Sequence, residues 1–402
     1  MLLKQSLRVC TFALLLACEP QDSVDHAVSL RLEEASAVPV SHVSKAQIAL
    51  LANTIWQQGL DALQNNQTQA EKLSNAIGVL LASPNQKNLT AARQQWRLSF
   101  LAYQQLAPFL SIRAGRVDAR AHHSIPLTNS ALNKLREWRF ALAAWPLRPG
   151  YLDSYGVHLH SGIVNDIAFP ITARHLRKQH GLTDSEEVIL GLHAIEFMLW
   201  AGDSKTAVER FIKKTKVPLV LAQSGLKQSE LPNNRRRALI ALQAQLFQQD
   251  LSALVGYWQP NGLFARSFQQ LKPLEKISAI HNGLRLSIDN LYTLFLNNGS
   301  KGDIYALHFN AFAGQRQQAI TEALSAIEAL YFVGDTSLIS LFFPVAEQQQ
   351  LAALLTEIKK QMNNENDADY TFTINALSQV ITLLAARTTP IGLQVWHSAE
   401  SR

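Results

Sequence analysis

The sequence predicts an all-α protein made of two antiparallel helical-bundle domains, with no substantial sheet. Three observations support this fold class. Apolar residues recur at helical spacing along most of the chain, strand-like alternation is scarce, and glycine and proline fall mostly between the periodic stretches. A helix with one apolar stripe must bury that stripe against other helices, so a bundle architecture follows.

The first element is a targeting segment. Lys4 and Arg8 precede the apolar stretch 11–16, which is too short to span a bilayer. Leu15-Leu16-Ala17-Cys18 resembles the lipobox of bacterial lipoproteins, in which the cysteine receives lipid. The sequence therefore predicts a signal peptide at 1–17 and lipid attachment at Cys18. An ordinary secretory signal followed by a chance cysteine is the alternative.

The predicted anchor also gives an expected location. Glu19 follows the cysteine, whereas the inner-membrane retention signal of enteric bacteria has aspartate there. We therefore expect an outer-membrane-anchored lipoprotein that faces the periplasm and contacts the membrane through its N-terminal lipid. Residues 18–44 form the lipidated cysteine and a polar tether. Cys10 lies in the removed segment, so no disulfide is expected.

Helical periodicity begins at Lys45, and the chain from that residue onward is predicted to form two domains. It appears first in Ile48, Leu51 and Ile55, then in Trp96, Phe100 and Tyr103, and later in Ile277, Ile280, Leu284, Ile288 and Leu291. A stretch from 202 to 234 mixes glycine, lysine, serine and proline and separates comparable halves. We place the N-terminal bundle at 45–205 and the C-terminal bundle at 206–395. Residues 259–273 form a second candidate boundary.

The positive charge does not indicate a nucleic-acid partner. The formal net charge is +6, and the basic clusters are 213–216 and Arg235-Arg236-Arg237. No RNA- or DNA-binding motif accompanies them. We interpret these clusters as charge on a helix surface or facing phospholipid, and we expect no nucleic-acid partner.

The segment 183–200 contains the most informative chemistry. Thr183 and Asp184, each followed three residues later by glutamate, predict a helix start. From 188 to 200 the predicted helix is apolar on every face and is interrupted only by His193 and Glu196, which are neighbours on one face. Gly191 lies inside this predicted helix, where it favours close approach of another helix or a ligand.

A buried carboxylate must have a compensating partner. The residues themselves leave three possibilities open for His193 and Glu196. They pair with each other, they pair with groups on other helices, or they bind a metal, because His and Glu three residues apart occur in helical-bundle metal sites.

The stretch from Gly191 to Trp200 closely resembles the G-x-H-x-x-E segment of the imelysin family. Further similar stretches are Trp145-Pro146-Leu147, Gly150 to Asp153, Gly162 to Asp166 with Phe169-Pro170, and Asn234 to Trp258. The resemblance covers roughly residues 45–360. It implies two helical bundle-like domains, a periplasmic or surface lipoprotein often linked to iron acquisition, and metal binding through the His and Glu of the motif.

This resemblance implies a metal site at His193 and Glu196, supported by Gly191 and Trp200. Iron is the expected ion and zinc the alternative. Asp153 and Asp166 are candidate additional ligands, because carboxylates suit such ions beside imidazole, although turn formation and helix capping explain them equally well. The implied role is iron uptake or sensing, with a membrane partner of iron uptake.

Two other functions remain open. In a helical binding or scaffold lipoprotein, the His–Glu pair would be a structural contact. Gln104 supports this alternative, because it stands where the resemblance implies a carboxylate. In a metallopeptidase, the pair would hold zinc. The sequence contains no His-Glu-x-x-His segment and no recognisable Ser/His/Asp arrangement, so it favours a role without catalysis.

The remaining histidines and tryptophans have simpler interpretations. We expect His281 to be a satisfied core or boundary histidine, and Trp96, Trp138, Trp145 and Trp258 to pack in the bundle. The pairs His122-His123 and His158-x-His160 lie in polar stretches and are weaker metal candidates.

Overall fold

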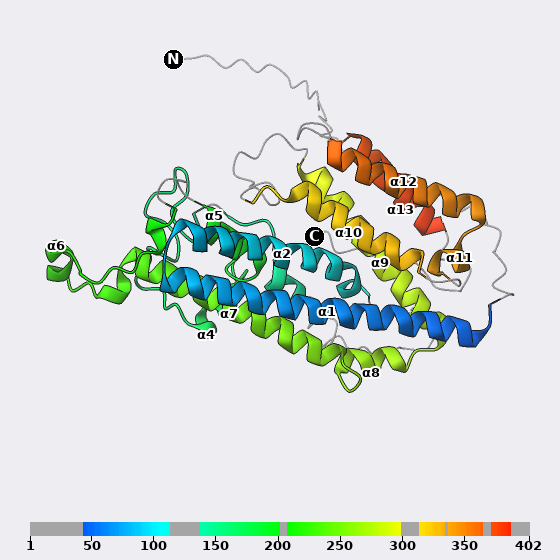
Figure 1. Ribbon diagram of the computed structural model, residues 1–402, viewed down its shortest axis with the longest axis horizontal. Helices are drawn as coiled ribbons and strands as arrows, with labels where there is room; N and C mark the ends of the chain where they lie inside the picture. The colour runs from blue at the N-terminus through cyan, green and yellow to red at the C-terminus, as the bar shows by residue number, and fades with distance from the viewer. Residues whose placement is uncertain are drawn as a thin grey trace, which may run out of the picture. The chain divides into compact units, whose positions relative to one another are not determined.

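The computed structural model describes residues 43–112, 137–148, 150–201, 207–298, 313–333, 337–364 and 371–386. Within these ranges the chain is helical and contains no strand; one isolated bridge pairs Tyr155 with His158. The predicted all-α fold is confirmed (Figure 1). Cys18, the signal peptide and His122-His123 lie outside the described residues.

The first group of helices is organised around α1 (Lys45–Ala82). Ser44 caps it through a reciprocal capping box, in which its hydroxyl accepts from the Gln47 amide and its own amide donates to the Gln47 side chain. A short connection leads to α2 (Gln86–Leu110), which packs along α1. The later helix α7 (Pro232–Trp258) packs against α1 and also contacts α5 (Leu192–Trp200).

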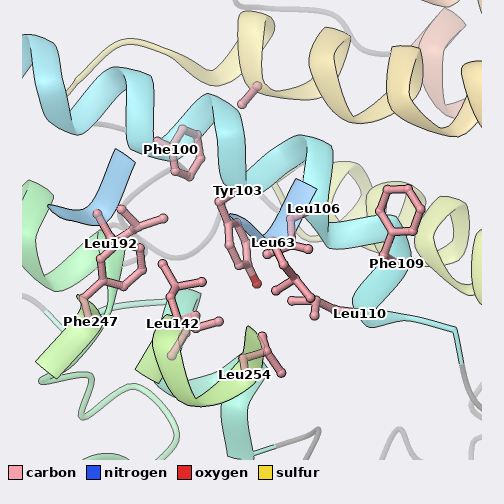
Figure 2. Packing of buried hydrophobic residues seen from close by; sticks show 14 of the residues in the cluster. Leu63, Phe100, Tyr103, Leu106, Phe109, Leu110, Leu142, Leu192, Phe247 and Leu254 are labelled. Atoms are coloured by element: carbon pink, nitrogen blue, oxygen red, sulfur yellow. The ribbon is translucent and has the colours of Figure 1, made fainter. Parts of the chain in front are cut away.

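Stacked aromatic rings join these helices at one end of α7. The Trp56 ring stacks on Trp258 with centroids 4.2 Å apart, and on Phe268 of α8 (Leu263–Gln269) at 4.3 Å. Figure 2 shows the buried side chains of α2, α5 and α7 meeting in the neighbouring core. The expectation that Trp96 and Trp258 serve as packing residues agrees with this arrangement, because both are buried.

The second group contains α9 (Pro273–Asn298), α10 (Arg316–Tyr331), α12 (Val345–Asn364) and α13 (Thr371–Ala386), with the short α11 (Leu338–Phe342) beside α10 and α12. Contacts of α9 with α1 and α2, and of α10 with α2, join it to the first group. The division at 205/206 stays a prediction. α7 follows that position in the sequence but packs with α1 and α5.

His281 shows how the second group buries a polar side chain. It lies on α9 with 1 % of its surface exposed, and its two ring nitrogens meet the Leu384 carbonyl at 3.3 Å and the Tyr331 hydroxyl at 3.1 Å. Burial lowers the pKa of His281 to about 4. The expectation of a satisfied core histidine is confirmed.

No helix in the described part of the chain is long and apolar enough to cross a membrane.

Candidate functional site

The helix that carries the motif begins later than predicted. α5 spans Leu192–Trp200, whereas the sequence predicted a helix from about 184. The acidic residues at its predicted start form a turn instead, in which the Asp184 carboxylate accepts from the Glu186 amide at 2.9 Å. The Asp184 carbonyl accepts from the Glu187 amide at 3.0 Å. A short polar side chain that bonds to the backbone two residues ahead favours a turn over a helix, which explains the error.

The stretch between this turn and α5 is buried and held by side chains. The His180 ring nitrogen Nδ1 accepts from the Ile189 amide at 3.0 Å. The Gln243 side-chain amide donates to the Ile189 carbonyl at 2.7 Å. These bonds satisfy backbone groups that a helix would have paired internally. His180 is therefore a residue of the site region that the sequence analysis missed, and its distance from the motif gave no indication of the contact.

Gly191 is the residue immediately before α5, not a residue inside it. Its backbone has φ 86° and ψ −175°, a conformation that favours glycine. A Cβ atom built at this position would lie 2.5 Å from the Leu142 carbonyl oxygen and 2.7 Å from that of Ala141. The predicted close approach is confirmed, and the approaching element is the backbone of the helical segment 137–143.

His193 and Glu196 contact each other inside the protein. The His193 Nδ1 atom lies 3.2 Å from Glu196 Oε2, and the two side chains are each only 1 % exposed. The imidazole packs beside the rings of Phe100, at a centroid distance of 5.5 Å, and Trp145, at 5.0 Å. The expected burial and the expected proximity on one helical face are both confirmed.

The second carboxylate oxygen of Glu196 reaches a distant part of the chain. Its Oε1 atom accepts a hydrogen bond from the Ala313 backbone amide at 2.9 Å, across 117 residues. Ala313 is itself buried and lies just before α10. Glu196 therefore connects the motif helix of the first group to the entry of a helix in the second group. Nothing in the sequence indicated Ala313, because a backbone amide has no residue-type signature.

The ends of α5 are also held by α2. The indole Nε1 of Trp96 donates to the Leu192 carbonyl at 2.7 Å, in the first turn of α5. Arg93 donates to the Leu199 carbonyl from Nε at 3.1 Å and from Nη2 at 2.9 Å, near the C-terminal end, where a cation complements the helix dipole. The guanidinium of Arg93 also lies 5.3 Å from the Trp200 ring centroid. Trp200 thus helps fix the motif helix through contacts with α2.

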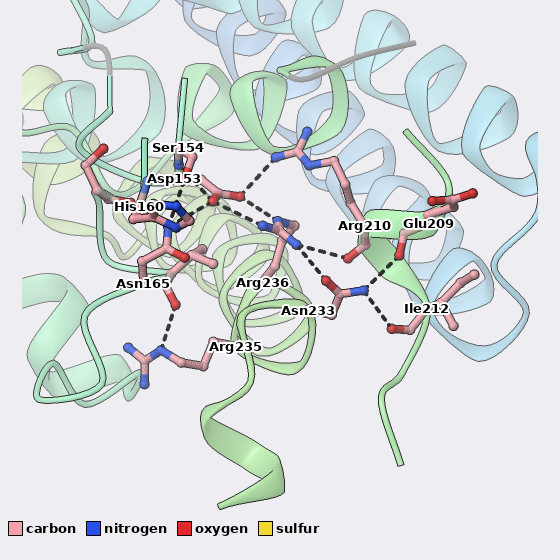
Figure 3. A network of polar contacts seen from close by, with 12 residues as sticks. Asp153, Ser154, His160, Asn165, Glu209, Arg210, Ile212, Asn233, Arg235 and Arg236 are labelled. Atoms are coloured by element: carbon pink, nitrogen blue, oxygen red, sulfur yellow. Dashed lines mark hydrogen bonds and ion pairs between the residues drawn. The ribbon is translucent and has the colours of Figure 1, made fainter. Parts of the chain in front are cut away.

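Asp153 is buried at a different cluster. Its carboxylate binds Arg236 of α7 (Nη2 to Oδ1, 3.1 Å) and Arg210 of η2 (Glu209–Phe211; Nη2 to Oδ2, 3.0 Å), as Figure 3 shows. Burial by itself would raise the pKa of Asp153. The hydrogen bonds and positive charges of Arg236 and Arg210 outweigh burial and hold that pKa below its ordinary value. Both oxygens are already engaged by arginine.

Asp166 forms a turn. Its side chain is exposed, its Oδ1 accepts from the Ala168 amide at 3.0 Å, and its backbone carbonyl accepts from Arg235 at 2.6 Å. Among the described residues, no three histidine, cysteine, aspartate or glutamate side chains form a group able to hold a metal ion. Neither Asp153 nor Asp166 is therefore grouped with the His193–Glu196 pair as a metal site.

The arginine cluster 235–237 is not helix-surface charge, contrary to expectation. Arg235 and Arg236 are only 6 % and 8 % exposed. The Arg235 guanidinium donates to four backbone carbonyls of the loop before α4 (Ala173–Gln179), those of Ile163, Val164, Asp166 and Phe169. Arg237 donates to the Phe211 carbonyl at 2.6 Å. Backbone acceptors are invisible in a sequence, so the run of arginines looked like a solvated face.

His193 and Glu196 provide fewer ligands than a metal centre needs. A protein-bound iron or zinc ion takes three or more protein ligands in most sites, usually imidazole, thiolate or carboxylate. The described residues supply two such groups, which are bonded to each other, and the second oxygen of Glu196 is occupied by an amide. Gln104, buried on α2, adds no charge. Within the described residues this donor set does not fit a metal held by protein ligands alone.

Comparisons with known proteins identify the fold and the family. A crystal structure of an imelysin-like protein from Psychrobacter arcticum 273-4 superposes with a TM-score of 0.59 at 14 % identity, covering 88 % of this chain and 98 % of that one. A Parabacteroides distasonis ATCC 8503 protein assigned as an iron-regulated protein A precursor gives a TM-score of 0.53 at 14 % identity, covering 87 % and 94 %. No curated protein sequence matches significantly. The family model of imelysin, which carries the peptidase M75 designation, matches residues 59–397, and the chain therefore belongs to the imelysin family.

Proposed function

We propose that this imelysin-family chain is an exported, lipid-anchored envelope protein with a binding role in iron uptake or sensing. The N-terminal sequence supports export and lipid attachment at Cys18. The likeness to a protein assigned as iron-regulated supports the link to iron. Membership of the imelysin family supports both parts of the proposal.

The single observation that carries the proposed role of the motif is the two-sided engagement of Glu196. One oxygen contacts His193 within α5, and the other accepts from the Ala313 amide before α10. We assign the pair as a buried structural lock between the two helix groups. Removing the carboxylate would leave the buried Ala313 amide without this acceptor, and an unsatisfied buried amide costs about 1 to 3 kcal/mol.

The second candidate role of the motif is to bind a divalent metal, with iron as the expected ion and zinc as the alternative. The resemblance to the imelysin motif implies this second role. The described residues supply only an imidazole and a carboxylate for it, and these two groups contact each other at 3.2 Å. If a metal binds there, His193 and Glu196 would hold it. Asp153 is excluded from the proposed set because its carboxylate is committed to Arg236 and Arg210.

Metal content distinguishes the two candidates. The untagged chain, with Cys18→Ser to prevent lipid attachment, is dialysed against trace iron and zinc beside a Glu196→Gln variant and analysed by mass spectrometry. Glutamine keeps the size and an acceptor oxygen but removes the charge. The structural lock predicts little metal in either protein. Near-stoichiometric metal in the parent, lost in Glu196→Gln, would replace the lock with a metal site.

A further inference from the structure

An exposed arm projects from the helical body between η2 and α7. It comprises residues 212–231 and contains α6 (Leu219–Gln223) and η3 (Gln228–Glu230). No residue from 212 to 230 is buried. In Figure 1, α6 lies at the left edge of the view, beyond the ends of α1 and α7. Residues 212–230 therefore place no side chain in the core, so the conformation of the arm needs another explanation.

The base of the arm is fixed by hydrogen bonds from the first turn of α7. Asn234 accepts from the Lys214 amide at 3.0 Å and donates to the carbonyls of Lys214 at 2.9 Å and Gln228 at 2.7 Å. The Asn233 side chain donates to the Glu209 and Ile212 carbonyls at 2.8 and 3.1 Å. The segment that enters the arm and the segment that leaves it are both hydrogen-bonded to α7, so the arm is held in a defined position.

The tip of the arm carries apolar side chains in solvent. Leu219 is 82 % exposed, Val220 77 % and Leu221 41 %. Single exposed apolar residues are common on protein surfaces, but three in succession at the end of a braced arm indicate an interaction site. Successive helical residues point about 100° apart, so these side chains project in several directions. A protein groove selects one helical face, whereas the interfacial region of a bilayer can surround all three.

The charge of the arm favours an anionic surface. Lys213, Lys214, Lys216 and Lys227 are all exposed. The one acidic residue of the arm, Glu230, uses its carboxylate to accept from the Lys227 amide at 2.6 Å. An arm that combines exposed basic residues with an exposed apolar tip has the composition that binds membranes containing anionic lipids.

We propose that the 212–231 arm docks on an anionic lipid surface, with Leu219, Val220 and Leu221 in the headgroup region and the lysines against lipid phosphates. This contact is separate from the N-terminal lipid and from the His193–Glu196 lock. Its effect would be to hold the helical body in one orientation at the membrane.

A probe at the tip tests the contact directly. The chain contains two cysteines, so Cys10→Ser and Cys18→Ser leave a background for a single label at Val220→Cys. A polarity-sensitive fluorophore there is titrated with phosphatidylcholine vesicles, with and without phosphatidylglycerol. The same label at Leu50→Cys on α1, 68 % exposed, is the control, since any binding through the N-terminal segment affects both proteins.

We expect a several-fold, blue-shifted rise in emission at position 220 with phosphatidylglycerol vesicles and little change at position 50. Replacing Lys213, Lys214 and Lys216 by glutamine should raise the half-maximal vesicle concentration roughly a hundredfold. The same change at the exposed Lys45, Lys72 and Lys87 should leave it near the parent value. No response at position 220, an equal response on phosphatidylcholine alone, or a response to rising protein concentration without vesicles would each overturn the proposal.

Discussion

Two buried polar clusters in this protein differ in how they are built. His193 and Glu196 come from one helix, three residues apart, and lie among aromatic rings. Asp153 is joined to Arg210 and Arg236, which are 57 and 83 residues away in the sequence. The first cluster carries the family motif, whereas the second brings two arginines to one carboxylate. The His193–Glu196 contact is therefore local in sequence, whereas the Asp153 cluster joins three segments that lie far apart in the chain.

The largest expected effect comes from breaking the second cluster. Asp153→Ala leaves two largely buried guanidinium groups without their carboxylate, and removing one partner of a buried ion pair costs about 3 to 5 kcal/mol. Urea unfolding followed by circular dichroism measures the loss. Asp166→Ala, which removes an exposed turn-forming carboxylate, is the control and should cost less than about 1 kcal/mol. Equal losses for both variants would show that the cluster is not an energetic centre.

A smaller loss in the free energy of unfolding is expected from a substitution at Gly191, where the start of the motif helix meets the backbone of residues 141–142. Gly191→Ala introduces a methyl group 2.5 Å from a carbonyl oxygen at a positive φ, so we expect a loss of about 3 kcal/mol. Gly225→Ala is a matched control, because Gly225 also has a positive φ but an added Cβ meets nothing within 4 Å. That variant should lose about 1 kcal/mol. If both variants lost the same free energy of unfolding, the backbone strain of a positive φ, and not the close approach of residues 141–142, would explain the need for glycine at position 191.

His281 is a third buried polar group, and it differs from both clusters because its partners are a carbonyl and a hydroxyl instead of a carboxylate. Burial and the nearby Arg285 charge lower its pKa from 6.5 to about 4. Since the unfolded chain then binds the proton more tightly, the free energy of unfolding should fall as pH drops from about 6.5 to about 4. The contribution of His281 is at most about 3 kcal/mol.

Urea unfolding at several pH values tests this contribution. His281→Gln removes the titrating group, so its unfolding free energy should change less between pH 6.5 and pH 4 than that of the parent. His180, whose pKa burial also lowers to about 4, keeps part of the pH dependence in both proteins. An identical pH dependence in parent and variant would contradict the assignment to His281.

The sequence predicted the parts of the structure that depend on local pattern. Helical periodicity identified the all-α fold. The two polar residues in an apolar stretch placed His193 and Glu196 together on one buried face, but left their contact with each other as one of three possibilities. The start of α5 was missed because Asp184 bonds to the backbone of a turn. Ala313, His180 and the carbonyl partners of Arg235 were missed because long-range pairing and backbone acceptors leave no trace in residue identity.

Amide hydrogen exchange at Ala313 tests the central claim most directly. We predict that Glu196→Ala speeds exchange of the Ala313 amide about tenfold or more, because about 1.4 kcal/mol of lost protection corresponds to a factor of ten. Glu196→Gln keeps an acceptor oxygen and should exchange nearly as slowly as the parent, and the buried Ala323 of α10 should be unaffected in both variants. Unchanged exchange at Ala313 in Glu196→Ala would show that the carboxylate does not lock the two helix groups together.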